Sequence, residues 1–195
     1  HSQGLAKAKQ MLRTTVTAHP LAAKALESGD RVLTLAEIPA QGIDMTMPPV
    51  SVEHRVQEGN TIPLGGLKLE VWQTPGHTAG QLAFRLGEVL FSADNIYRDG
   101  CVGAIDAQHG SNIPDFIESL QRIRKSDVKY LLPSHGPIFA KDNALLDRAI
   151  ARLQEYRHRA DFGTCATDWP LMDEWEREIA DGKLPFPAVF ARPSN

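Results

Sequence analysis

Two β-hairpin patterns in succession constrain the fold of this 195-residue sequence more than any other feature. The strands that the apolar alternation predicts run over residues 61–64, 67–72, 82–86 and 89–91. Gly65-Gly66 and Gly87-Glu88 supply the tight turns between them. Because helical patterns flank this block, we expect a layered α/β fold with mixed sheets and not a purely parallel sheet.

Helical periodicity predicts most of the remaining elements. The predicted helices run over residues 4–12, 21–28, 114–125 and 145–156, with a last short one from about 168 to 179. Further strands are predicted at residues 14–18 and 130–132. Residues 39–49 lack periodicity and are rich in Pro, Gly and Met, so they predict a surface loop, and 183–195 predict a tail.

Composition excludes several classes of protein. The chain is long enough for one domain, and its apolar runs are far shorter than the ~20 residues that a membrane span needs. Its 21 Lys+Arg and 24 Asp+Glu are mixed along the chain, which argues against a nucleic-acid-binding face. Cys101 and Cys165 form no zinc-ribbon or disulfide pattern, so we expect free thiols and a cytoplasmic protein.

Three polar residues follow directly after predicted buried strands. They are His77 in T-P-G-H-T-A-G, Asp94 in F-S-A-D and His135 in P-S-H-G. Loops at strand ends are where rigid scaffolds display functional side chains, and a neighbouring glycine leaves room for a close approach. Two imidazoles and a carboxylate that converge from separate strands predict a metal site of the kind that suits zinc.

These motifs, in this order, resemble those of the metallo-β-lactamase-fold hydrolase superfamily. T-P-G-H-T-x-G is followed by an Asp 17 residues later and by S-H-G 41 residues after that. Because an Asp stands at position 94, the chain resembles the glyoxalase II-like branch of this superfamily, in which an aspartate bridges the two metals. The resemblance implies an αββα sandwich over residues 1–140, with residues 141–195 as a helical extension packed on the same domain.

The same resemblance extends to the first residues of the chain. His1-Ser2-Gln3-Gly4-Leu5 is similar to the end of the family's H-x-H-x-D-H-x-G-G-L motif, whose earlier part does not occur in this sequence. We therefore expect an N-terminally incomplete domain that lacks several strands and three metal ligands. In the ligand set that the family implies, His77 binds the first metal, the catalytic Asp94 bridges both, and His1 and His135 bind the second.

For the intact protein, the resemblance implies a hydrolase with two zinc ions. A zinc-bound hydroxide would attack a small ester, thioester or lactone, with Tyr97, Arg98 and His109 as candidate substrate contacts. One alternative is a persulfide dioxygenase-like enzyme with a single iron, and another is a non-catalytic binding module of the same fold.

The remaining histidines, His19, His54 and His158, are interpreted as structural or surface residues. We expect a small-molecule substrate as the partner, and we expect the chain to bind neither nucleic acid nor a membrane. The sequence leaves open whether the chain forms a homo-oligomer.

Overall fold

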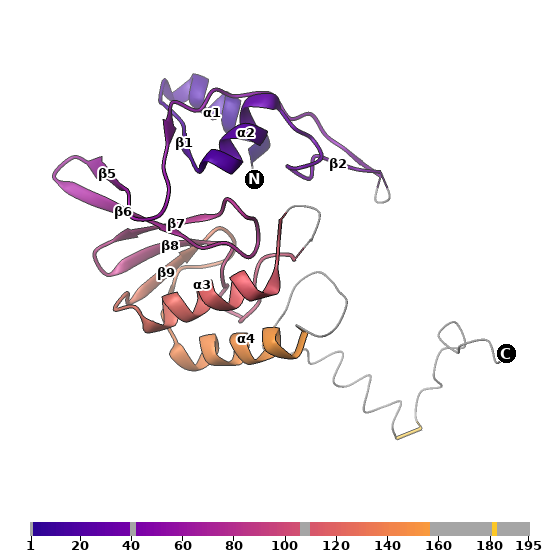
Figure 1. Cartoon of the computed structure of the whole chain (residues 1–195), viewed down its shortest axis with the longest axis vertical. Coiled ribbons are helices and arrows are strands. Elements are labelled where there is room, and N and C mark those ends of the chain that lie inside the picture. The colour runs from indigo at the N-terminus through magenta and orange to yellow at the C-terminus, as the bar shows by residue number, and fades with distance from the viewer. Residues whose placement is uncertain (1, 40–41, 106–109, 157–180, 183–195) are drawn as a thin grey trace.

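A six-stranded mixed sheet forms the centre of the structure, a computed structural model that describes residues 2–39, 42–105, 110–156 and 181–182 (Figure 1). Its strands, in sheet order, are β10 (Phe139–Ala140), β9 (Tyr130–Pro133), β8 (Val89–Ala93), β7 (Leu82–Leu86), β6 (Leu67–Gln73) and β5 (Thr61–Leu64). All neighbouring pairs are antiparallel except β8 and β9, which are parallel. The predicted mixed α/β fold is therefore confirmed.

The parallel pair needs a crossover connection, which α3 (Ile113–Lys125) provides. Asn112 begins this helix, since its side chain accepts a hydrogen bond from the Asp115 amide at 2.8 Å. α4 (Asn143–Tyr156) packs beside α3 against the same face of the sheet. The main core lies between these helices and the strands, and includes Trp72, Ala83, Leu90, Phe116, Leu120, Ile123, Leu131, Leu146 and Leu153.

The N-terminal elements lie on the other side of the sheet (Figure 1). They comprise η1 (Ser2–Gly4), α1 (Leu5–Leu12), α2 (Pro20–Ser28), the parallel pair β1 (Thr17–Ala18) and β4 (His54–Arg55), and the hairpin β2 (Glu37–Ile38) and β3 (Ile43–Asp44). A second apolar cluster holds them together, formed by Val16, Ala23, Leu26, Ala36, Met47, Val50 and Val52. In the described part of the chain, no helix combines the length and hydropathy needed to cross a membrane.

His19 fixes the start of α2 and joins it to the sheet. The ring is buried, and its Nδ1 accepts a hydrogen bond from the Leu21 amide at 3.2 Å. Burial lowers the pKa of His19, which favours the neutral ring that this acceptor role requires. Nδ1 also lies 3.3 Å from where a Cβ on Gly80 would stand, so α2 packs against the loop after β6. The structural interpretation of His19 is confirmed.

Most of the predicted elements are confirmed, two expectations are wrong, and the short edge strand β10 was not predicted. The segment 39–49 is not wholly a loop, because Ile43–Asp44 pairs with Glu37–Ile38 in a short hairpin. The strand expected at 14–18 is reduced to Thr17–Ala18, and its partner His54–Arg55 was not predicted. The helix expected over 4–12 is confirmed as α1 (Leu5–Leu12), and a 3₁₀ turn over Ser2–Gly4 precedes it. The helix at 168–179 and the tail at 183–195 lie outside the described residues.

Ala93, the last residue of β8, has an unusual backbone conformation. Its φ is +50°, a left-handed value that costs a residue with a Cβ about 1–2 kcal/mol. The Ala93 carbonyl accepts a hydrogen bond from the Ser134 amide at 2.9 Å. This bond ties the residue before Asp94 to the residue before His135, so the strained position lies where two candidate ligand loops meet.

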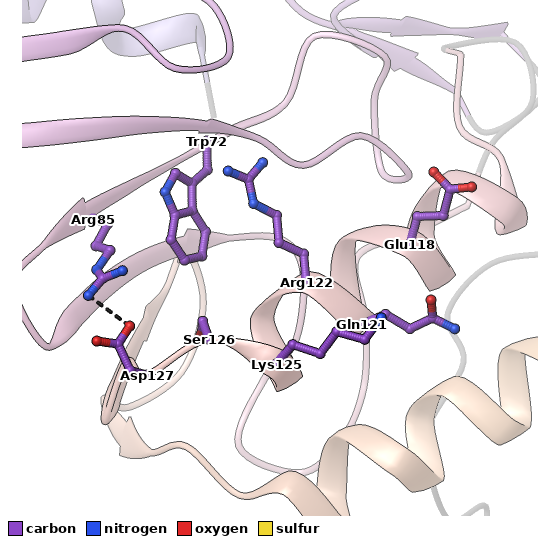
Figure 2. A pocket seen from close by; sticks show the side chains of 8 residues that line it. All are labelled: Trp72, Arg85, Glu118, Gln121, Arg122, Lys125, Ser126 and Asp127. Atoms are coloured by element: carbon purple, nitrogen blue, oxygen red, sulfur yellow. Dashed lines mark ion pairs between the residues drawn. The ribbon is translucent and has the colours of Figure 1, made fainter.

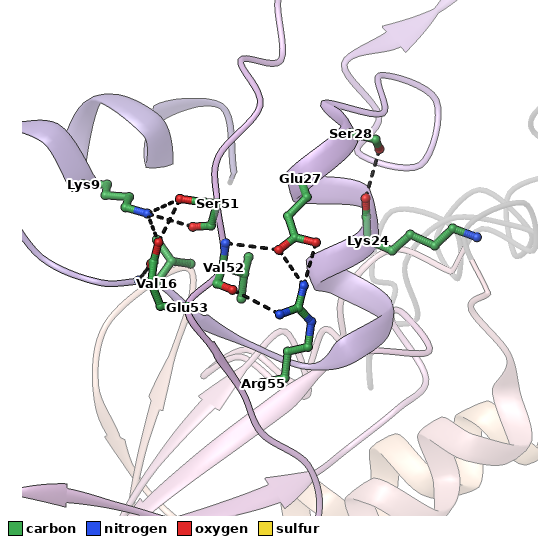
Figure 3. A network of polar contacts seen from close by, with 9 residues as sticks. All are labelled: Lys9, Val16, Lys24, Glu27, Ser28, Ser51, Val52, Glu53 and Arg55. Atoms are coloured by element: carbon green, nitrogen blue, oxygen red, sulfur yellow. Dashed lines mark hydrogen bonds and ion pairs between the residues drawn. The ribbon is translucent and has the colours of Figure 1, made fainter.

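A polar network joins α1 and α2 to the segment before β4 (Figure 3). Lys9 forms an ion pair with Glu53 and donates a hydrogen bond to the carbonyl of Ser51 at 2.9 Å. Glu53 also accepts a hydrogen bond from the Val16 amide at 2.9 Å. These contacts, led by the bond from Lys9, lower the pKa of Glu53 from its ordinary value of 4.5 to about 2.

We expect Glu53→Gln to lower the thermal midpoint at pH 7, and the deficit to shrink as the pH falls from 4.5 toward 2. The depressed pKa means that the ionised carboxylate stabilises the folded chain above pH 4.5, and that protonation removes this contribution at lower pH. Thermal unfolding of both proteins across pH 2–7 measures the effect. Glu118→Gln, at an exposed position on α3, is the matched control. A deficit that does not change with pH would contradict the prediction.

Candidate metal centre

The sheet brings His77, Asp94 and His135 to one edge. β6 and β8 are both antiparallel to β7, and β9 is parallel to β8, so the carboxyl ends of these three strands meet. His77 lies in the loop after β6, Asp94 follows β8 directly, and His135 follows β9. The structure thus assembles the three residues that the sequence motifs single out.

Asp94 lies between the two imidazoles. Its Oδ2 is 3.9 Å from His77 Nε2, and its Oδ1 is 3.7 Å from His135 Nε2. Asp94 is only 7% exposed, whereas the His135 side chain is 61% exposed, so the centre opens to solvent on the His135 side. Each imidazole therefore faces a different oxygen of one carboxylate, which is the arrangement that a bridging ligand requires.

Backbone groups set the orientation of His77. Its Nδ1 donates a hydrogen bond to the carbonyl of Ala104 at 2.7 Å, which leaves Nε2 to face Asp94. The amide of Gly103 donates to the Asp94 carbonyl at 2.9 Å. A Cβ at Gly103 would lie 2.8 Å from Asp94 Cβ and 2.9 Å from His77 Nδ1, so only a glycine fits there.

A buried network of uncharged polar groups joins the His77 loop to Asp94. Gln81 donates from Nε2 to the Thr74 carbonyl at 2.8 Å and accepts at Oε1 from the Asp94 amide at 3.3 Å. Asn95 donates from Nδ2 to Thr74 Oγ1 at 3.0 Å and to the Ser92 carbonyl at 2.7 Å. All four side chains are buried. This network was not predicted from the sequence, because the hydropathy pattern does not show that polar residues next to a motif are buried.

Of the other predicted site residues, the structure describes Tyr97 and Arg98. Tyr97 lies against the centre, and its hydroxyl donates a hydrogen bond to Asp94 Oδ1 at 2.6 Å. Burial, followed by the contact with Asp94, raises the pKa of Tyr97. Arg98 is exposed on the following loop. His1 and His109 lie outside the described residues.

Within the described residues, no group of three His, Cys, Asp or Glu side chains is arranged to hold a single ion. His77 and His135 face opposite oxygens of Asp94, so they do not converge on one point. The assignment of His1, His77, Asp94 and His135 as ligands stays a prediction.

A separate cavity of about 480 Å³ opens near the carboxyl end of α3 (Figure 2). Trp72 lies in its wall between two guanidinium groups, with Arg122 at 4.5 Å and Arg85 at 5.7 Å from the ring centroid. Arg85 forms an ion pair with Asp127, and Arg122 forms one with Glu58. The residues that line this cavity do not include His77, Asp94 or His135, so the cavity is not part of the candidate centre.

The model of the metallo-beta-lactamase superfamily matches residues 1–135, about two thirds of the sequence. The chain belongs to the metallo-beta-lactamase superfamily. The match covers the helices before the sheet, the strands β5 to β9 and all three residues of the candidate centre.

Curated members of the superfamily with similar sequences have names that describe hydrolases. The chain is 33% identical to the probable polyketide biosynthesis zinc-dependent hydrolase BaeB of Bacillus velezensis, over 43% of this chain and 34% of the relative. It is 35% identical to the acyl-coenzyme A thioesterase MBLAC2 of Gallus gallus, over 49% and 36%. It is 29% identical to a hydroxyacylglutathione hydrolase of Rhodopseudomonas palustris, over 53% and 43%. The chain thus spans less than half the length of each relative.

Among solved structures of the superfamily, the di-iron-bound form of TTHA1623 is similar in both sequence and fold. It is 30% identical, with a TM-score of 0.59 over 76% of this chain and 70% of that one. The metallo-beta-lactamase fold predicted from the motifs is confirmed by this similarity and by the match to the family.

Proposed function

We propose that this chain carries the centre of a metal-dependent hydrolase that acts on a small ester, thioester or lactone. The position of Asp94 is the observation that carries the proposal, because its two oxygens face two different imidazoles at 3.7 and 3.9 Å. Family membership supports it, as do relatives that are named as a thioesterase, a hydroxyacylglutathione hydrolase and a zinc-dependent hydrolase.

The residues present fit a divalent metal. Imidazole nitrogens and a carboxylate are ligands that zinc and iron(II) both accept. The absence of a Cβ at Gly103 keeps His77 and Asp94 close, and the Ala104 carbonyl fixes which ring nitrogen of His77 faces the centre. We propose zinc as the resident metal, in line with the name of the BaeB relative, and iron as the alternative, in line with TTHA1623.

In the proposed reaction, the metal would supply the chemistry and the residues of the chain would position it. In hydrolases of this kind, bound zinc supplies a hydroxide nucleophile at neutral pH and polarises the substrate carbonyl. The chain's own residues hold this machinery: Gln81 and Gly103 fix the Asp94 backbone, and Ala104 orients His77. His135 lies on the more exposed side, where a substrate would approach.

Elemental analysis combined with a thioesterase assay tests the proposal. The protein should be expressed with any native sequence that precedes His1 retained. We expect about two zinc ions per chain, hydrolysis of an acyl-coenzyme A or hydroxyacylglutathione thioester, loss of activity on chelation and recovery with added zinc. One iron without hydrolysis would favour the dioxygenase alternative, and no bound metal would favour the binding module.

The remaining expectations concern partners and location. We propose a small-molecule substrate as the partner, in place of nucleic acid or a membrane, and a cytoplasmic location. The free thiol of Cys101 supports the cytoplasmic location, and Cys165 lies outside the described residues. The mixed charges along the sequence support a small-molecule partner in place of nucleic acid. The division into residues 1–140 and 141–195 also stays a prediction, although α4 packs on α3 through Leu145, Leu146 and Ala149.

A further inference from the structure

Tyr97 contacts two members of the candidate centre. Its hydroxyl donates to Asp94 Oδ1 at 2.6 Å, a short distance that is typical of a hydrogen bond to a charged carboxylate. Its ring packs edge-on against His135, with ring centroids 5.8 Å apart and planes at 77°. The oxygen that Tyr97 contacts is the one that faces His135 Nε2.

From these contacts we infer that Tyr97 is a positioning residue, which fixes the rotation of the Asp94 carboxylate and thereby assigns one oxygen to each histidine. This inference rests on the metal-dependent function proposed above. The torsion that turns a carboxylate about its Cβ–Cγ bond has only a weak intrinsic preference. The backbone contacts of Asp94 with Gln81 and Gly103 do not act on that torsion, whereas the bond from Tyr97 acts on it directly through Oδ1.

The loop around Tyr97 holds the hydroxyl in place. The Tyr97 amide donates to the carbonyl of Cys101 at 2.8 Å, and the Gly100 amide donates back to the Tyr97 carbonyl at 3.0 Å. The Cys101 amide donates to Asp99 Oδ1 at 3.0 Å, which closes the turn further. Because this turn is already ordered and Tyr97 is half-buried, little conformational entropy is lost when the hydroxyl contacts Asp94.

The same geometry argues against Tyr97 as a hydrogen-bond donor to the substrate. A phenol has one O–H, and in the structure that group is donated to Asp94. To donate to a substrate carbonyl, Tyr97 would have to break this bond and release the carboxylate. The substrate contact expected from the sequence is therefore replaced by a role that acts through Asp94.

Tyr97→Phe tests the inference, because it keeps the ring against His135 and removes the hydroxyl. We expect the affinity for cobalt(II), used as a spectroscopic probe, to fall about 10-fold or more, as it does when other groups that orient metal ligands are removed. The visible absorption spectrum of the cobalt form should change, and kcat should fall with little change in KM. Tyr130→Phe, at an exposed position on β9, is the matched control and should alter neither the affinity nor the spectrum.

The outcomes separate this inference from the proposed function. Unchanged cobalt affinity and spectrum in Tyr97→Phe would overturn the positioning role, and a raised KM alone would restore the substrate contact. If the unmodified protein takes up no cobalt and hydrolyses no thioester, the proposed function fails and the inference fails with it. Thermal unfolding of the metal-free proteins shows whether the variant is folded, and we expect nearly equal midpoints.

Discussion

Replacing His77 with alanine should remove both metal uptake and hydrolysis. The His77 side chain is 20% exposed, held by the Ala104 carbonyl, and faces Asp94 Oδ2. If the metal contributes several kcal/mol of transition-state stabilisation, its loss corresponds to a decrease in kcat/KM of about 10³-fold. Metal content per chain and steady-state hydrolysis of a thioester, measured on the same preparation, give the result.

A second histidine provides the control for this experiment. His54 is exposed and lies on β4, which pairs with β1 in a separate two-stranded sheet and not with the sheet that carries the candidate centre. His54→Ala makes the same chemical change, so metal content and activity should stay at the level of the unmodified protein. A His77→Ala protein that keeps its full metal content and rate would show that His77 is not a ligand.

Gly76→Ala should destabilise the folded chain by about 3 kcal/mol or more. The φ of Gly76 is +137°, and a Cβ there would lie 2.6 Å from both Cα and Cγ of the fully buried Phe116. The backbone conformation costs about 1–2 kcal/mol for a residue with a Cβ, and the overlap with the core adds a packing cost of similar size or larger. Urea unfolding monitored by circular dichroism measures the change, which is a large part of a typical stability of roughly 5–15 kcal/mol.

Gly59→Ala separates the backbone cost from the overlap. Gly59 has a φ of +77°, but a Cβ there would meet nothing within 4 Å. The Gly59→Ala variant should therefore lose only the backbone cost of about 1–2 kcal/mol. Equal losses in the two variants would mean that the contact with Phe116 relaxes without cost, contrary to this prediction.

Local patterns were enough to predict five of the six strands of the central sheet, all except β10, and the two helices that pack on it. The strands β6 and β7 alternate in hydropathy, β8 is a short apolar run, and Gly-containing turns join β5 to β6 and β7 to β8. The helix α3 has one continuous apolar face that includes Phe116 and Leu120. The loops that hold His77, Asp94 and His135 could be predicted for the same reason, since each follows a strand marked by alternation or by a short apolar run. Their convergence depends on strand order, which the family resemblance provided and the hydropathy pattern did not.

Other features depend on contacts between segments distant in the sequence. The two-residue strands β1 and β4 are too short to show any alternation, and they pair only because the second apolar cluster brings them together. Gln81 and Asn95 are polar residues whose burial follows from mutual hydrogen bonds. The left-handed conformation of Ala93 is imposed by its place between two loops, and alanine itself does not indicate it.

The hydrogen bonds beneath the candidate centre have an evolutionary consequence. Most of them use backbone groups: the Ala93 carbonyl, the Gly103 amide and the Ala104 carbonyl. Backbone groups persist when side chains are exchanged, so neighbouring exposed positions such as Arg98 are free to diverge without displacing the ligands. In the hydrolase proposed here, substitutions at such exposed positions would change substrate preference while the backbone keeps the candidate metal ligands in place.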